Sequence, residues 1–350
     1  MSAAAVPALR THAVPACPLC ADAGALVHRG LVDTLFGVPG AWGFRRCGRA
    51  DCGLLWLDPA PIDEDLALAY ARYYTHGATG PAPAGPLRRA WAGVKAGYLS
   101  RRFGYRIAGG GWKRAASFVL TPFPTRRESL ETLALHLPAV PGGRVLEIGC
   151  GAGDSLRALG ELGWQAEGVD LDPEVARVAA QRGLTVRVGD VFAPAYAAET
   201  FDAVAMIHAL EHVPRPLATL AEVRRILRPG GRLVIVTPNA DSLGHRVLGG
   251  SWRGLEPPRH LQVFGPAALR RVARDAGFGA VTLRSSARMA AVIHAESRRI
   301  ASGLPASAPG RLVRASDLAF QWRERLGLAQ DPWAGEELIL IAQGESSVGA

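Results

Sequence analysis

Residues 144–154 read R-V-L-E-I-G-C-G-A-G-D, and this stretch decides the fold. Its first half is a short apolar run bounded by glycines, which is typical of a buried parallel strand. The glycines of its second half let the chain turn tightly and approach a ligand with no Cβ in the way. Asp154 is expected to cap a helix over residues 155–162. The pattern G-x-G-x-G therefore predicts a ligand-binding loop, but one that differs from the G-x-G-x-x-G of dinucleotide folds.

Further apolar segments with strand character follow this unit at regular intervals. They cover residues 165–170, 185–188, 201–207 and 232–237, and a helix is expected over residues 215–227. Asp170 ends the second strand, where doubly wound folds place the carboxylate that binds a ribose. Strands that alternate with helices and end in polar groups predict an open, mostly parallel α/β sheet.

Six motifs in this order resemble those of the class I S-adenosylmethionine-dependent methyltransferases, over residues 140–278. They are E147-I-G-C-G-A-G153, V169-D170, G189-D190-V191, F201-D-A-V204, A209-L-E-H-V213 and L227-R-P-G-G-R-L233. The resemblance implies a methyltransferase enzyme with a Rossmann-like, doubly wound, seven-stranded sheet. That sheet is mostly parallel, and the strand formed last, expected over residues 337–342, is antiparallel.

The same resemblance implies which residues bind S-adenosyl-L-methionine. Glu147 and the glycine loop would flank the methionine moiety, Asp170 the ribose hydroxyls, and Asp190 with Val191 the adenine. The implied cofactor-binding residues are Glu147, Gly149, Cys150, Gly151, Gly153, Asp170, Leu171, Asp190, Val191 and His208. The chemistry agrees, because a carboxylate accepts hydrogen bonds from two hydroxyls and exposed backbone amides suit a carboxylate ligand.

The chain of 350 residues is longer than one such domain requires, so we expect added segments. The expected organisation is a disordered start (1–16), a zinc-ribbon-like segment (17–60), a helical basic lid and linker region (61–139), the methyltransferase core (140–285), a helical insertion (286–334), and a closing strand and tail (335–350). No apolar run approaches ~18 residues, and the first residues do not resemble a secretory signal. We therefore expect a cytoplasmic protein.

Four of the five cysteines form two close pairs, and the fifth lies in the glycine loop. The pairs are Cys17-Pro-Leu-Cys20 and Cys47-Gly-Arg-Ala-Asp-Cys52. Two such knuckles in an intracellular protein indicate a structural Zn²⁺ site with four thiolate ligands, and four thiolates leave no position open for chemistry. Reduced free thiols are the alternative, because the second spacing is wider than the usual C-x2-C. Together with the core, this segment resembles the N-terminal ribbon of a bacterial branch of these methyltransferases.

Residues 66–127 contain no acidic residue and eleven arginines and lysines. Aromatic residues are interleaved with them: Trp91, Tyr98, Phe103, Tyr105, Trp112 and Phe118. Three interpretations stay open. The segment is a lid over the cofactor, it lies on an anionic membrane surface through residues 86–127, or it contacts nucleic acid through phosphates and stacking.

The acceptor side of the crevice is expected after the strand at 201–207, where His208-Ala209-Leu210-Glu211-His212 follows. A metalloprotease with H-x-x-E-H needs both histidines on one helix, and this segment instead leaves a strand. His208 is a candidate general base, because a neutral imidazole accepts a proton near pH 7. Some related methyltransferases use E-x-x-E-H and a later histidine to hold a divalent metal. Simple packing of Glu211-His212 at the sheet edge is the third alternative.

A loop at residues 252–261 carries further polar and aromatic groups, among them Glu256, Arg259 and His260. Loops at the carboxyl edge of such a sheet commonly bind ligands, although this loop could also lock onto its own domain. The predicted catalytic residues are His208, His260, Glu211 and Arg259, with one histidine as the base for a hydroxyl and Glu211 or Arg259 orienting the acceptor.

The sequence therefore predicts methyl transfer from S-adenosylmethionine to a hydroxyl of a small molecule or of a glycan or secondary-metabolite intermediate. Two alternatives stay open. A zinc ribbon before such a core also resembles ribosomal-RNA guanine methyltransferases, and a net charge of +9 suits an RNA partner. The other alternative is a cofactor-binding protein without catalysis. The acceptor and the oligomeric state are not set by any motif.

Overall fold

The apolar run before the glycine loop forms strand β6 (Arg144–Ile148). The structure is a computed structural model, and it describes residues 7–70, 85–108, 110–305 and 313–344. The chain divides into two compact units. Unit 1 comprises Met1–Tyr73, His208–Arg224 and Ile235–Ala342, and unit 2 comprises Tyr74–Ile207, Arg225–Val234 and Gln343–Ala350.

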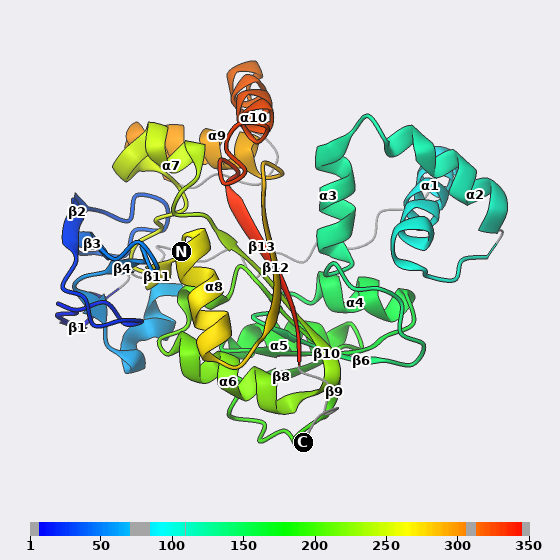
Figure 1. The fold of residues 1–350 in the computed structure, drawn as a ribbon, viewed down its shortest axis with the longest axis horizontal. Helices are drawn as coiled ribbons and strands as arrows, with labels where there is room; N and C mark the ends of the chain where they lie inside the picture. Colours follow the sequence, from blue (N-terminus) through cyan, green and yellow to red (C-terminus); the bar gives the residue numbers. More distant parts are fainter. Residues whose placement is uncertain (1–6, 71–84, 109, 306–312, 345–350) are drawn as a thin grey trace, which may run out of the picture. The chain divides into compact units, whose positions relative to one another are not determined.

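The predicted sheet is present with seven strands in the order β12-β13-β10-β9-β6-β7-β8 (Figure 1). Besides β6 they are β7 (Gln165–Asp170), β8 (Thr185–Val188), β9 (Phe201–Ile207), β10 (Leu227–Pro238), β12 (Ala280–Ser286) and β13 (Glu337–Gln343). Strands β6 to β9 pair in parallel. The hydrogen bonds Asn239 N to Glu336 O and Gly344 N to Gly231 O make β13 antiparallel to β10, as expected.

The helices of the sheet connections are α4 (Asp154–Glu161), α5 (Pro173–Gln181), α6 (Pro216–Ile226) and α8 (Pro266–Asp275). One detail of the prediction is wrong: Asp154 is the first residue of α4 and not its cap. The cap position is Gly153, whose φ of +77° places it in the left-handed region. The helix must start directly from the glycine turn, and this leaves no extended residue in front of it for a side-chain cap.

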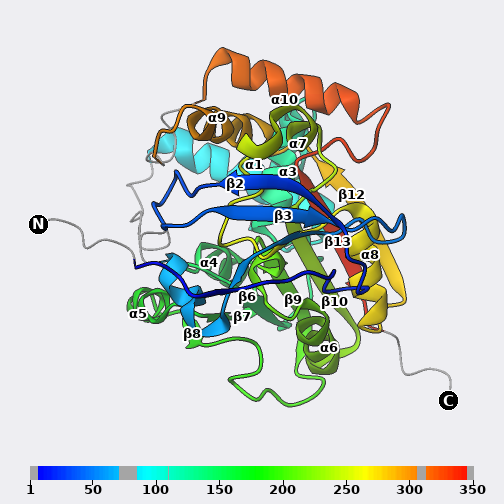
Figure 2. The same ribbon diagram turned by 90° about the vertical axis from the view of Figure 1, so that its left-hand side faces the viewer.

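The strands of the cysteine-bearing segment share a sheet with a distant loop. Strands β2 (Ala25–Leu31), β3 (Trp42–Arg46) and β4 (Leu55–Leu57) form an antiparallel sheet whose edge strand is β11 (Gln262–Val263). Figure 2 shows β2 and β3 side by side. The sequence favours short strands at residues 44–46 and 54–57, and β3 and β4 confirm both, whereas β2 and β11 were not predicted.

Side chains from both parts of the sequence form the core of this small sheet. Trp42, Phe44 and Leu55 pack with Trp252 and Val263, all of them buried. A short pair of strands, β1 (Thr11–His12) and β5 (Ala60–Pro61), and a 3-10 helix, η1 (Asp63–Tyr70), complete this part of unit 1. Three acidic residues at the start of the segment 63–74 favour a helix there, and η1 occupies its first eight residues, while residues 71–74 lie outside the described part of the chain.

Unit 2 contains the basic segment as helices α1 (Pro86–Phe103), α2 (Gly110–Ala116), η3 (Ser117–Leu120) and α3 (Pro124–Leu133). Gly104 ends α1 with a φ of +82°. Helices α1 and α2 pack closely at Gly97, where a Cβ would lie 2.0 Å from the carbonyl oxygen of Lys113. Residues 77–86 are rich in glycine, proline and alanine, which is typical of a linker, and residues 77–84 of this stretch lie outside the described residues.

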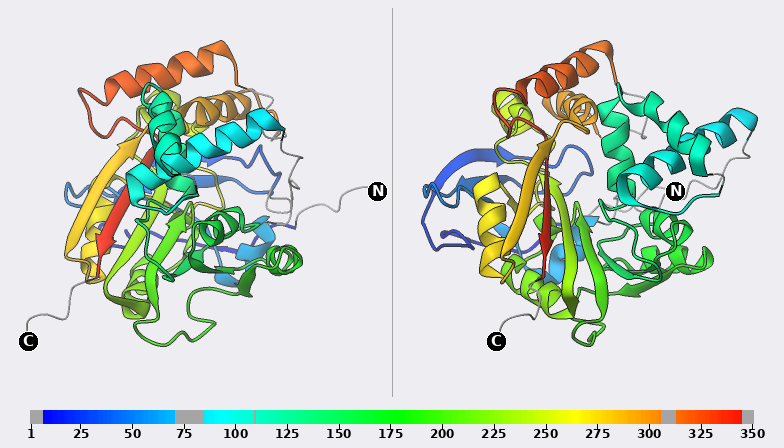
Figure 3. Two further views of the ribbon diagram at one scale, coloured as in Figure 1. Left: turned by 90° about the vertical axis from the view of Figure 1, so that its right-hand side faces the viewer. Right: turned by 45° about the vertical axis from the view of Figure 1, so that its right-hand side comes forward.

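Unit 1 also carries α7 (Leu243–Leu248), η4 (Leu210–His212), η5 (Gly249–Ser251), α9 (Ala290–Ala301) and α10 (Ala315–Gly327). Helices α9 and α10 pack against each other, and the views of Figure 3 agree on this arrangement. Asp317 of α10 is fully buried between His294 (2.6 Å) and Arg298 (2.8 Å) of α9. Among the described residues, no helix is both long and apolar enough to cross a membrane.

A pair of buried carboxyl groups fastens α10 to the start of β13. Glu324 accepts a hydrogen bond from the backbone N of Glu336 at 2.7 Å, and Glu336 accepts one from Trp252 Nε1 at 2.7 Å. Burial, together with the charges of neighbouring carboxylates, raises the pKa of Glu324 to about 10 and that of Glu336 to about 8. Both groups therefore keep protons in the folded protein that the unfolded chain releases near pH 4.3.

We expect this pair to make the protein less stable as the pH rises. A carboxyl whose pKa is raised by folding makes its full contribution to the free energy of unfolding below the pKa of the unfolded chain. Between the unfolded and the folded pKa this contribution falls by about 1.4 kcal/mol per pH unit and group. Glu324→Gln, which keeps the acceptor and can donate to Glu336, should flatten the fall in melting temperature between pH 6 and 8. Denaturation followed over pH, with the exposed Glu161→Gln as control, checks this. Equal slopes for wild type and Glu324→Gln would contradict it.

Candidate functional site

The glycine loop after β6 holds three glycines in the left-handed region. Gly149, Gly151 and Gly153 have φ values of +72°, +50° and +77°. Gly151 N donates to Asp170 Oδ2 at 2.9 Å, and Asp170 Oδ1 accepts from Asp172 N at 3.1 Å. The carboxylate at the end of β7 is therefore fixed against the loop, and the two elements form one polar edge within unit 2.

The neighbouring predicted residues differ in exposure. Glu147 is 4% exposed and accepts a hydrogen bond from Ser155 Oγ, and burial raises the pKa of its carboxyl to about 8. Cys150 and Val191 are buried, whereas Leu171 is 58% exposed. Asp190 follows β8, the strand next to β7, and its Oδ1 accepts from Phe192 N at 3.0 Å. The strand ends thus place a buried carboxyl, a glycine loop and two carboxylates in sequence along one edge.

In unit 1, His208 begins the segment after β9 with a φ of +51°. Its Nε2 lies 2.8 Å from Glu337 Oε1, and its Nδ1 lies 3.5 Å from Glu211 Oε1. Burial lowers the pKa of His208, but the two carboxylates outweigh burial and raise it to about 9. Arg288 holds Glu337 from its other side. His208 is therefore an imidazolium at neutral pH, with both ring nitrogens directed at carboxylates.

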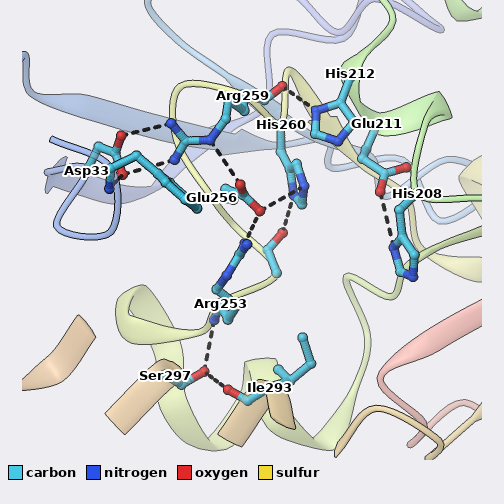
Figure 4. Close-up of polar contacts among 12 residues, drawn as sticks. Asp33, His208, Glu211, His212, Arg253, Glu256, Arg259, His260, Ile293 and Ser297 are labelled. Carbon is cyan, nitrogen blue, oxygen red and sulfur yellow. Dashed lines mark hydrogen bonds and ion pairs between the residues drawn. The ribbon is translucent and has the colours of Figure 1, made fainter. Parts of the chain in front are cut away.

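The ring contacts of His212 and His260, drawn in Figure 4, differ from those of His208. His212 Nδ1 lies 3.0 Å from the carbonyl oxygen of Arg259, and His260 Nδ1 lies 2.8 Å from that of Gly254. A carbonyl only accepts, so Nδ1 donates in each of these two contacts, and a neutral ring then has its lone pair on Nε2. The hydroxyl of Tyr70 also lies 2.8 Å from His212 Nδ1, and Glu256 Oε2 lies 3.4 Å from His260 Nε2. Burial lowers the pKa of His212 and lowers that of His260 well below its usual range. Both rings are neutral at neutral pH.

Glu211 lies beside these two imidazoles and is fully buried. Thr237 Oγ1 donates to Glu211 Oε2 at 2.9 Å, while Glu211 Oε1 faces the Nδ1 of His208 at 3.5 Å. One ligand atom from each of Glu211, His212 and His260 lies within 4.8 Å of the others. Three side chains that can each supply a ligand atom to one ion therefore lie together.

Arg259 is 1% exposed and does not present its guanidinium to a ligand. It makes two hydrogen bonds to Asp33, at 2.8 and 2.9 Å, and one from Nε to Glu256 Oε1 at 2.9 Å. Phe36 lies against its guanidinium at 4.3 Å. A cavity of about 320 Å³ adjoins this cluster and is lined by Asp33, Trp252, Glu256, Arg259 and residues around them.

The structure thus brings together part of the predicted catalytic set. His260 and Glu211 lie side by side, with His212 as the third member, and His208 reaches Glu211 from the other direction. The sequence interpretation missed Glu337 and Asp33. Glu337 had a signal, because two glutamates open an otherwise apolar strand and buried carboxylates need partners. Asp33 is a single acid in a loop and had none.

The four predicted zinc ligands also lie together in unit 1. The Sγ atoms of Cys17 and Cys52 are 3.8 Å apart, those of Cys20 and Cys47 are 3.4 Å apart, and all four lie within 4.8 Å. Each pair is followed by a left-handed residue, Ala21 (φ +61°) and Gly53 (φ +64°). The two knuckles therefore have matching backbones, although the second has two more residues between its cysteines.

Comparison with known proteins gives this chain a family. The profile of a family described as "Methyltransferase domain" matches residues 125–283. A ubiquinone biosynthesis O-methyltransferase of Burkholderia pseudomallei is 30% identical over 161 residues, which are 42% of this chain and 69% of that protein. One of Xanthomonas campestris pv. campestris is 42% identical over 110 residues, or 29% of this chain. The chain spans less than half of that relative's length, 45%.

Solved structures show a weaker similarity. A SAM-dependent methyltransferase from Thermotoga maritima aligns over 71% of this chain and 99% of its own chain, with 20% sequence identity and a TM-score of 0.43. A similarity at this level adds nothing to the family match.

The glycine loop and Asp170 lead to a prediction for cofactor binding. Asp170→Ala should weaken S-adenosylmethionine binding by at least tenfold, because it removes a carboxylate that accepts charge-assisted hydrogen bonds, at roughly 1.5–3 kcal/mol each, and it frees the loop. Titration calorimetry measures this, with the exposed Asp154→Ala as a control of matched charge. Wild-type affinity in Asp170→Ala would remove Asp170 from the site.

Proposed function

The chain belongs to the class I S-adenosylmethionine-dependent methyltransferases, and from this premise we propose that it methylates a hydroxyl of a small molecule. The observation that carries the proposal is the pair of neutral imidazoles beside a carboxylate, His212 and His260 with Glu211. A hydroxyl is a weak nucleophile until its proton is removed, and a neutral imidazole can take that proton.

In the proposed step the hydroxyl oxygen forms a bond to the methyl carbon while the carbon–sulfur bond breaks. The sulfonium becomes a neutral thioether, and the hydroxyl proton passes to an imidazole Nε2. The base contributes ~10²–10⁴-fold, and alignment of methyl and oxygen in a water-poor site supplies the rest. The two relatives named as O-methyltransferases support an oxygen acceptor.

The site geometry divides the four predicted catalytic residues by role. We assign the base to His260 or its neighbour His212, both neutral. His208 is already protonated by its two carboxylate neighbours, so it holds Glu211 in place and does not accept a proton. Arg259 is fully engaged by Asp33 and Glu256, so it shapes the loop that carries His260. The cavity of about 320 Å³ is lined by Glu256 and Arg259 of this loop but by none of Glu211, His212 and His260, so it is not itself the place of the proposed proton transfer.

A divalent cation fits the same trio. One ligand atom from each of Glu211, His212 and His260 lies within 4.8 Å of the others, and carboxylate oxygens and neutral imidazole nitrogens are ligands that divalent metals bind. Such an ion would hold the acceptor hydroxyl as a Lewis acid and lower its pKa. The E-x-x-E-H motif of related metal-binding methyltransferases has a glutamate at the position of His208, so this chain offers the metal one ligand fewer.

The four cysteines support a second, structural ion. A tetrahedral zinc with Zn–S bonds of about 2.3 Å sets its sulfur atoms about 3.8 Å apart. The measured separations of 3.8 and 3.4 Å agree with that geometry. We propose that zinc closes the two knuckles at the end of the sheet formed by β2, β3, β4 and β11. In the absence of the metal, we expect the loss of order to be local to these strands.

Zinc content tests this structural proposal directly. Protein purified without added metal should contain close to one zinc per chain, and Cys47→Ser should lose it together with thermal stability. Cys150→Ser, which alters the cysteine outside the cluster, is the control and should keep the metal. Less than a tenth of one zinc per chain, with four titratable thiols in the cluster, would exclude the site.

The proposed base is tested by methyl transfer from labelled S-adenosylmethionine to simple catechols, such as 3,4-dihydroxybenzoate. His260→Gln and His212→Gln should each lower turnover by about 10²-fold with cofactor binding intact. The exposed His12→Gln is the matched control and should not change turnover.

A chelator separates the two modes of activation. Loss of turnover that added Mn²⁺ or Mg²⁺ restores assigns the trio to a metal, whereas unchanged turnover assigns a direct base. Turnover within threefold of wild type in both His260→Gln and His212→Gln, across pH 6–9, would refute the trio's role. Failure to methylate any hydroxyl despite tight cofactor binding would refute the proposed function itself.

A further inference from the structure

Helix α10 exposes an apolar stripe on the side that does not pack on α9. Leu318, Trp322 and Leu326 recur every four residues and therefore lie on one face, with exposed fractions of 49%, 59% and 70%. The views of Figure 2 and Figure 3 both show α10 with one side against α9 and the other turned away from it. Water thus contacts three large apolar side chains in a row, which is uncommon on a helix of a soluble domain.

The charges around this stripe have one sign. Both acids of α10, Asp317 and Glu324, are 0% exposed because they point inward to α9 and to the start of β13. The cations Arg314 and Arg323 are exposed. The outer face of α10 therefore combines apolar groups and positive charge, with no exposed acid on the helix.

Unit 2 repeats this combination independently. Trp112, Phe118, Val119 and Phe123, on and around α2 and η3, are 50% to 61% exposed. Cations lie over two of these rings: Arg101 stands 4.2 Å from the ring of Phe118, and Lys113 stands 5.8 Å from that of Trp112. The sequence has no acidic residue from 85 to 127. We call this set the aromatic surface.

We propose that the outer face of α10 and the aromatic surface bind the headgroup–acyl boundary of an anionic lipid bilayer. Basic amphipathic helices with leucine and tryptophan on one face lie in this boundary, and tryptophan is enriched there. Anionic headgroups complement a surface that has only cations, and acyl chains take up the leucines. The inference stands apart from the proposed function.

Two other occupants suit the surfaces less well. A second copy of the chain would bring a face with no exposed acid against the arginines of α10, and like charges brought together are unfavourable. Nucleic acid would complement the charge and stack on the aromatic rings, but it offers nothing to Leu318 and Leu326, because phosphates and sugars are polar. The aliphatic members of the stripe therefore favour lipid.

Co-sedimentation of the full chain with vesicles tests the proposal. Equimolar phosphatidylglycerol and phosphatidylcholine should bind the protein at least tenfold better than phosphatidylcholine alone. The triple variant Leu318→Gln, Trp322→Gln, Leu326→Gln should lose at least tenfold, and Arg314→Gln and Arg323→Gln about fivefold each. Phe118→Gln with Phe123→Gln tests the aromatic surface separately. Leu217→Gln, an exposed leucine on α6, is the matched control and should bind as wild type does.

Three results would overturn the proposal. The first is equal binding to neutral and anionic vesicles. The second is vesicle binding that neither the triple variant nor the phenylalanine pair reduces. The third is the absence of vesicle binding together with one of two other associations that the triple variant abolishes. These are self-association, measured by sedimentation equilibrium, and binding of a single-stranded oligoribonucleotide. Unchanged S-adenosylmethionine binding in each variant shows that the fold is intact.

Discussion

The guanidinium of Arg259, buried between Asp33 and Glu256, is the constraint on which unit 1 depends. A buried cation is costly unless carboxylates and carbonyls accept hydrogen bonds from its N–H groups. The acceptors for Arg259 come from three separate segments: Asp33 after β2, Glu256 in the loop after β10, and the carbonyl of Ala69 in η1. Removing one partner leaves the others as uncompensated buried charges, which typically costs about 3–5 kcal/mol. The contact therefore holds the cysteine-bearing strands, η1 and the loop in one arrangement.

That arrangement places the histidines as well. The carbonyl of Arg259 accepts from His212 Nδ1, and the next residue is His260, whose own Nδ1 is fixed by the carbonyl of Gly254. Two backbone carbonyls thus select the tautomers that leave both Nε2 atoms free of hydrogen. The pKa values of two histidines in this cluster shift in opposite directions. Carboxylates on both sides raise the pKa of His208, while burial lowers the pKa of His260. Charge is concentrated at one end of the cluster and neutral donors at the other.

The cysteine knuckles connect to this centre through the sheet. Strand β4, which follows the second knuckle, pairs with β11, and β11 directly follows the histidine-bearing loop. The backbone N of Leu57 donates to the carbonyl of Leu261 at 2.9 Å, next to His260. A zinc at the knuckles would therefore stabilise the sheet that supports the proposed base, while remaining outside the chemistry.

The sequence by itself determined the α/β sheet, because alternating apolar strands, glycine turns and polar strand ends depend on local pattern and spacing. It also determined the polar edge from Glu147 to Asp190 and the four-cysteine set, where neighbours in sequence supply the contacts. Tertiary structure alone decided the roles of His208, Arg259 and His260. Their partners Glu337 and Asp33 are more than 120 residues away in sequence, and a histidine's protonation state depends on which distant carboxylate or carbonyl the fold places beside it. Spacing carries no information on that choice, because burial and charge are set only when the chain is packed.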